Sequence, residues 1–226
     1  MSSLDTSVLD SSPLQGSYSW TDTLKGVYYG PGSIVHALPK LLDTLGVKKA
    51  LIVTGRSLYQ KVTQQILKKY ASLIWTFKQT DVLSKVEAIL KEHSAFGTTF
   101  FEIGEHSPIS GIRNGIQKYK ETGCECIVAV GGGSPIDASK AILYNIQKEF
   151  GGKTPPQIAI PTTLSAAEYT VSFVAKESPF THKLYQIGAG FTNDEGHKVA
   201  VSSQELAPAG IILDAELTLA TPERLW

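Results

Sequence analysis

CIVAVGGGSPID, residues 126–137, is the stretch that decides the fold of this chain. Its apolar first half predicts a strand that is buried on both faces, as in parallel sheets. The glycines predict a tight turn whose backbone can approach a ligand without Cβ clashes. Ser134 is expected to cap the following helix, with Pro135 at its first position, so that free N–H groups point outward. Such a terminus binds anions and suits a pyrophosphate, and a plain strand-to-helix turn is the simpler alternative.

The alternation of strand and helix continues on both sides of this stretch. Further apolar runs of strand length lie at 27–29, 50–54, 99–103, 158–160 and 211–213. Segments with helical periodicity lie at 34–45, 58–70, 83–93, 109–122 and 135–147. Strands that alternate with helices of this length form right-handed βαβ units. The expected fold is therefore α/β, with an open, mostly parallel, Rossmann-like sheet that carries helices on both faces.

The two ends of the chain have a different character. Residues 183–188 and 198–201 flank a turn rich in Gly, Asn and Asp, which predicts a β-hairpin near the C-terminus. Residues 1–18, rich in Ser, Asp and Thr, are expected to form a flexible arm. The remainder, 19–226, is expected to be one dinucleotide-binding domain.

Hydroxyl side chains gather after the predicted strand 158–160. Thr162, Thr163 and Ser165 follow it closely, at the edge where open α/β sheets bind ligands. They are therefore expected to lie beside the glycine turn. Taken alone, the segment is equally well explained as the start of a helix capped by Ser165.

Composition excludes several classes of function. The 21 Lys and Arg balance the 21 Asp and Glu, whereas a nucleic-acid-binding protein normally has a basic surplus. No stretch has membrane-spanning length, and the N-terminus lacks a signal-peptide pattern. We therefore expect a cytoplasmic protein with no nucleic-acid or membrane partner. Cys124 and Cys126 lie too close along one strand to form a disulfide, and we interpret them as reduced core thiols.

The glycine stretch followed by Pro-Thr-Thr at 161–163 resembles the phosphate and nicotinamide loops of the iron-containing alcohol dehydrogenase family. That family includes maleylacetate reductases, and dehydroquinate synthase is a relative. Residues 29–32, 51–55 and 212–214 are also similar to family segments, so the chain looks like its nucleotide-binding half. The resemblance implies an NAD(P)-dependent alcohol dehydrogenase or carbonyl reductase with a small-molecule substrate.

The same resemblance implies which residues hold the cofactor. Glycines and Ser134 would hold the pyrophosphate, Asp137 would lie near the nicotinamide ribose, and hydroxyls would line the second loop. The implied residues are Gly131, Gly132, Gly133, Ser134, Asp137, Thr162, Thr163 and Ser165. The family has Gly-Ser where this chain has Ala166-Ala167.

The chain departs from the family most in its metal site. The family's second, helical half supplies one Asp and three His to a divalent metal, and this chain is expected to end before those ligands. The five histidines show no ligand spacing, so no metal is expected. Catalysis would need a substitute proton donor. The candidates, none supported by a motif, are Tyr185, Lys183, His182 and Glu168.

Two further departures concern the cofactor and an extra segment. The family has an acidic residue after the strand that ends at Thr54, where this chain has Gly55 and Arg56. Without the carboxylate, and with an arginine nearby, a 2′-phosphate is tolerated, so we expect NADP or NAD as the cofactor. Residues 62–80 are extra relative to the family, either as a helical insertion or as a gene-model artefact.

Three functions remain open on the sequence. The first is an oxidoreductase that acts without the metal. The second is a non-redox enzyme derived from this fold, a cyclase or isomerase of an apolar metabolite. The third is an incomplete subunit that needs a partner chain. The resemblance also implies a homodimer in which the N-terminal strand, residues 25–29, pairs with its twin.

Overall fold

The computed structural model describes residues 16–18, 23–60, 82–169, 171–174, 184–219 and 221. One sheet has seven strands, which are, from edge to edge, β1 (Gly16–Tyr18), β2 (Gly26–Tyr29), β10 (Gly210–Leu213), β6 (Gln157–Pro161), β5 (Cys126–Gly131), β3 (Ala50–Gly55) and β4 (Phe96–Ile103). All neighbours are parallel except β1 and β2. The predicted open, mostly parallel sheet is confirmed.

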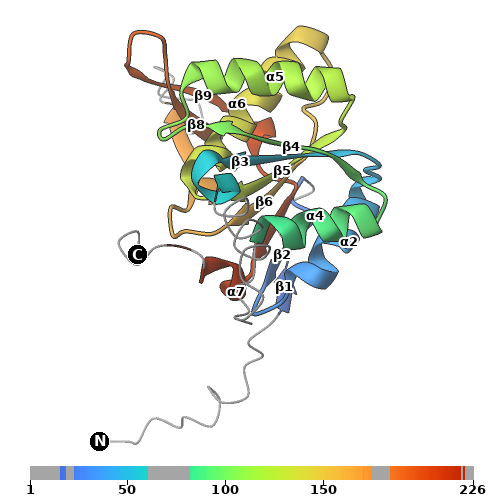
Figure 1. The fold of residues 1–226 in the computed structure, drawn as a ribbon. Coiled ribbons are helices and arrows are strands. Elements are labelled where there is room, and N and C mark those ends of the chain that lie inside the picture. The colour runs from blue at the N-terminus through green and yellow to red at the C-terminus, as the bar shows by residue number, and fades with distance from the viewer. Residues whose placement is uncertain are drawn as a thin grey trace, which may run out of the picture.

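Helices cover both faces of this sheet (Figure 1). One face carries α2 (Ile34–Leu45), α4 (Val82–Glu92) and α7 (Ala215–Thr218). The other carries α5 (Ile109–Thr122) and α6 (Gly133–Phe150). Of the helix predicted over 58–70, residues 58–60 are helical, in a turn that begins at residue 56. Residues 61–70 lie outside the described residues, as does the whole of the extra segment 62–80. None of the described helices combines the length and hydropathy that a membrane span requires.

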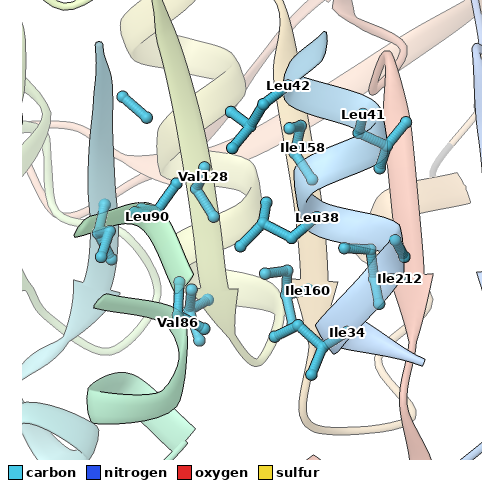
Figure 2. Packing of buried hydrophobic residues seen from close by; sticks show 14 of the residues in the cluster. Ile34, Leu38, Leu41, Leu42, Val86, Leu90, Val128, Ile158, Ile160 and Ile212 are labelled. Carbon is cyan, nitrogen blue, oxygen red and sulfur yellow. The ribbon is translucent and has the colours of Figure 1, made fainter. Parts of the chain in front are cut away.

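The buried central strand β5 shows why the sequence folds this way. Val128 and Val130 point into the core under α2 and α4, while Ile127 and Ala129 point into the core under α5 and α6. Figure 2 shows the first core, where Leu38 of α2 lies among side chains of the neighbouring strands. A strand packed on both faces holds the glycine turn at its end in a fixed place.

A second, antiparallel sheet packs beside α6. It consists of β7 (Val171–Val174), β8 (Leu184–Thr192) and β9 (Lys198–Ser203). The predicted hairpin is confirmed as β8 and β9, with Thr192 opposite Lys198 next to the turn. The pairing of β7 with β8 was not predicted. Phe191 and Val201 anchor this sheet to the core under α5 and α6.

The N-terminal edge of the main sheet differs from expectation. Gly16–Tyr18, placed in a flexible arm by the sequence prediction, form β1, because they pair antiparallel with β2. As a consequence β2 is not an edge strand, since it has β1 on one side and β10 on the other. The strand expected to pair with a twin is thus covered within its own chain.

Candidate functional site

An open cavity of about 940 Å³ lies at the carboxyl ends of four parallel strands, β3, β4, β5 and β6. The loop after each strand contributes to its wall. The lining residues are Gly55, Arg56, Ser57, Leu58, Gln60, Ile103, Gly104, Glu105, His106, Gly131, Gly132, Gly133, Ser134, Pro135, Thr162, Thr163, Leu164, Ser165 and Thr221. The set brings together the glycine turn, the hydroxyl segment and the Gly55–Arg56 pair, which are far apart in sequence.

The cavity opens at the point in the sheet where the order of successive strands changes direction. Leu58, in the helical turn after β3, packs into the core that α2 and α4 cover. The helix after the adjacent strand β5 is α6, which lies on the opposite face. Neighbouring loops therefore diverge at this point, and open α/β sheets bind ligands in the crevice that forms there.

The glycine turn borders a space that side chains would fill if its glycines were replaced. Gly131 has φ +136°, a conformation that L residues rarely adopt. A Cβ on Gly132 would lie 3.1 Å from Thr163 Oγ1, and one on Gly133 would lie 3.3 Å from Ser165 Oγ. Because these glycines leave the backbone bare against the hydroxyl segment, the cavity fits a pyrophosphate in contact with both loops.

The role expected for Ser134 as a helix cap is wrong. The helix α6 begins at Gly133, Gly132 occupies the N-cap position, and no side chain caps it. Ser134 therefore lies inside the first turn, where its hydroxyl can turn toward a neighbouring loop. Its Oγ accepts a hydrogen bond from the His106 N–H at 3.2 Å, and its carbonyl accepts one from the Ser107 hydroxyl at 2.9 Å.

The hydroxyl segment is held against the glycine turn by backbone contacts. The Thr162 N–H donates to the Gly131 carbonyl at 2.9 Å, and the Thr221 hydroxyl donates to the Thr162 carbonyl. Ser165 does not cap a helix, because the short 3-10 helix η1 begins only at Ala167 (Ala167–Tyr169). Between them Ala166 has φ +53°.

The loop between β4 and α5 was missed by the sequence prediction. Glu105 and His106 line the cavity, and two successive residues, His106 and Ser107, have φ values of +59° and +50°. Their bonds to Ser134 fix this loop to the first turn of α6. No local motif marks these residues, because their proximity to the glycine turn follows only from the order of the strands.

Lys140 lies fully buried behind the glycine turn, on α6. Its Nζ donates to the carbonyls of Ala167 at 2.5 Å and Gly188 at 3.0 Å, and it lies 3.4 Å from Asp137 Oδ1. Burial lowers the pKa of Lys140, and the Asp137 carboxylate opposes that shift. The ammonium thus joins α6 to η1 and β8; its only signal in the sequence is the three-residue spacing from Asp137.

Two acids complete this buried cluster. Asp137 accepts a hydrogen bond from the Gly190 N–H, and burial raises its pKa, with Lys140 opposing. It is not among the residues that line the cavity, so its contact with a nicotinamide ribose stays a prediction. Glu168 is 6% exposed, and its Oε2 has no hydrogen-bond partner among the residues that the structure describes. Burial raises the pKa of Glu168 as well.

The other candidates for proton transfer are less well defined. The backbone of Tyr185 pairs with Phe173 in the antiparallel sheet, and its side chain lies outside what the structure describes. His182 and Lys183 lie outside the described residues. In the described part of the chain, no three His, Cys, Asp or Glu side chains form a group that could hold a metal ion.

Comparison with known proteins gives one consistent result. The sequence model of a family described as iron-containing alcohol dehydrogenase matches residues 25–215. The chain is 29% identical to maleylacetate reductase from Rhizobium sp. (strain MTP-10005) over 123 residues, which cover 54% of this chain and 28% of that protein. It is 36% identical to 4-hydroxybutyrate dehydrogenase from Cupriavidus necator over 129 residues, 50% of this chain and 30% of the relative.

Solved structures agree with the sequence matches. The crystal structure of the Rhizobium maleylacetate reductase has a TM-score of 0.62 at 25% identity, covering 92% of this chain and 45% of that one. Sulfoacetaldehyde reductase from Bifidobacterium kashiwanohense, solved in complex with NAD+, has a TM-score of 0.61 at 20% identity, covering 92% and 49%. The chain thus spans less than half of the length of these relatives.

Proposed function

Because the chain belongs to the iron-containing alcohol dehydrogenase family, we propose that its cavity binds a nicotinamide dinucleotide and that the protein is an NAD(P)-dependent oxidoreductase of alcohols or carbonyl compounds. The observation that carries the proposal is the bare glycine turn against the hydroxyl segment at the direction change of the sheet. When bound, the nicotinamide would carry the hydride. The chain's own residues would bind and orient it.

The pyrophosphate site is the best defined part of the proposal. The backbone of Gly132 and Gly133 begins α6, so the N–H groups and the dipole of an 18-residue helix are directed at the cavity. Thr163 and Ser165 add hydroxyl donors from the other side. The hydrogen bond from Thr162 to Gly131 fixes the spacing of the two loops.

A binding measurement tests this site. Wild-type protein titrated with NADPH or NADH, followed by nicotinamide fluorescence, should show saturable binding. Gly132→Leu should weaken it by more than about tenfold, because the side chain would enter the space between the loops. Ser110→Leu, on the exposed start of α5, is the matched control and should bind normally. Wild type that binds neither cofactor at millimolar concentration would contradict the proposal.

NADP(H) is the favoured cofactor in this proposal. Gly55 stands where the family has an acid, and Arg56 lines the cavity beside it. A guanidinium there favours a 2′-phosphate. A Cβ on Gly55 would meet its nearest atom, the Ile103 carbonyl oxygen, at an ordinary 3.7 Å, so Gly55→Asp fits sterically. That variant should lower NADPH affinity about tenfold or more relative to NADH. Equal loss for both cofactors would contradict the assignment.

The described residues contain no group of side chains that could bind a metal ion, so the proposed chemistry uses no metal bound by them. We propose that the isolated chain holds far less than one equivalent of iron or zinc. Elemental analysis of protein purified without a metal-affinity tag measures this directly. Stoichiometric metal would mean that ligands come from elsewhere in the chain or from a second subunit.

A further inference from the structure

The wall of the cavity that carries Arg56 also carries a charge of the opposite sign. Glu105, on the loop between β4 and α5, lines the same cavity. The strands β3 and β4 are adjacent and parallel, and Gly55 pairs with Ile103, so the loops that follow them leave the sheet side by side. A cation and an acid therefore face the cavity from neighbouring loops.

These charges are few, so each one matters for a charged ligand. Among the described residues that line the cavity, the charged or titratable ones are Arg56, Glu105 and His106. His106 Nε2 lies 3.9 Å from Glu105 Oε1. Both side chains are well exposed, so an ion pair between them at this distance is weak and leaves the carboxylate free to act on a ligand.

The loop that presents Glu105 is held in a strained shape. The left-handed backbone of His106 and Ser107 is one that residues other than glycine adopt at a cost. Hydrogen bonds to Ser134 on one side, and from Thr192 to the carbonyls of His106 at 3.1 Å and Ser107 at 3.2 Å on the other, maintain it. The backbone next to Glu105 is thus fixed relative to the glycine turn.

We propose that Glu105 is a second cofactor-specificity residue, which favours the free ribose hydroxyls of NAD(H) and disfavours the 2′-phosphate of NADP(H). This inference rests on the proposed function. A carboxylate accepts hydrogen bonds from ribose hydroxyls and repels a phosphate, so Glu105 takes over the role of the acid missing at Gly55. Arg56 acts in the opposite direction, so the wild-type chain binds both cofactors, and its preference for NADP(H) is limited.

The test is the ratio of the dissociation constants for NADH and NADPH, measured by fluorescence titration. Glu105→Gln should shift that ratio toward NADPH by about three- to tenfold, the Coulomb effect of one exposed carboxylate on a phosphate dianion. Arg56→Gln should shift it toward NADH. The matched control is Glu102→Gln, which removes the same charge from β4 at a side chain that bonds to Asn114 and lies outside the cavity wall. It should leave the ratio within about twofold of wild type.

The outcomes separate the two proposals. An unchanged ratio in Glu105→Gln, with a shift in Arg56→Gln, overturns the role of Glu105 and leaves the proposed function standing. Equal shifts in Glu105→Gln and Glu102→Gln show a general charge effect and overturn it too. Wild type that binds neither cofactor overturns the proposed function, and this inference with it.

Discussion

Ala166 adopts a left-handed backbone, with φ +53°, in the loop that lines the cavity. Residues with a Cβ adopt this conformation at a cost of roughly 1 kcal/mol, which glycine avoids. Ala166→Gly is therefore expected to raise the free energy of unfolding by about 0.5–1 kcal/mol. Urea denaturation measures it. The control Ala88→Gly, at an exposed position inside α4, should lower stability by about 1 kcal/mol. Similar losses in both variants would refute the argument.

Glu168 predicts a dependence of stability on pH. Burial raises its pKa above the ordinary 4.5, so the folded state holds its proton more tightly than the unfolded state does. The stability that this proton contributes is complete below pH 4.5 and is lost as pH rises through the raised pKa. Glu168→Gln should lack that loss and be more stable than wild type at neutral pH, by on the order of 1 kcal/mol. Parallel stability curves for the two proteins from pH 4.5 to 7.5 would contradict this prediction.

At the scale of residues, the sequence predicted the cavity only in part. The glycine turn was recognisable because a buried strand leads into it and a helix follows. Ser134 was misplaced because Gly133 can begin a helix as easily as the serine can cap one. Glu105 and His106 gave no signal, since what brings them to the cavity is the pairing of β4 with β3.

Lys140 connects three elements, and its loss should separate them. Its ammonium bonds to carbonyls in η1 and β8, and it offsets the charge of Asp137. Lys140→Met should lower the free energy of unfolding by about 2–4 kcal/mol, because two buried carbonyls and one carboxylate lose their partner. Lys118→Met, at a half-exposed lysine of α5, should change it by less than about 0.5 kcal/mol. A Lys140 variant as stable as this control would show that water replaces the ammonium.

At the scale of elements, strands with a strong apolar pattern were predictable, and strands defined by pairing were not. The runs that became β3, β5 and β6 are buried on both faces, and composition alone reveals such strands. In contrast β1 and β7 have three and four residues and gain strand structure only by lying antiparallel to β2 and β8. Short strands of that kind have no periodicity to read.

For the whole molecule we expect a homodimer, formed through β1 rather than β2. In the described part of the chain β1 and β4 are the two edge strands of this sheet, and an edge strand offers backbone groups for pairing with a second copy; β1 is the edge next to the expected strand β2. Light scattering should give twice the chain mass. Deleting residues 1–18 should yield a monomer, whereas deleting 1–12 should not. A dimer that survives loss of β1 would place the contact elsewhere.

The position of β10 has a consequence for how the nascent chain folds. It separates β2 from β6, with Gly210 opposite both Gly26 and Ile158. Asp214 lies four residues after Gly210. Its carboxylate accepts hydrogen bonds from the N–H groups of Gly32 and Ile34 at the start of α2, which lie 182 and 180 residues earlier in the chain. At about 5–20 residues per second of synthesis, the first strands wait roughly ten to forty seconds on the ribosome for their partner. During that delay the part of the apolar face of α2 that packs on β10, around Leu41, has no strand to cover it, so we expect holding chaperones to bind there.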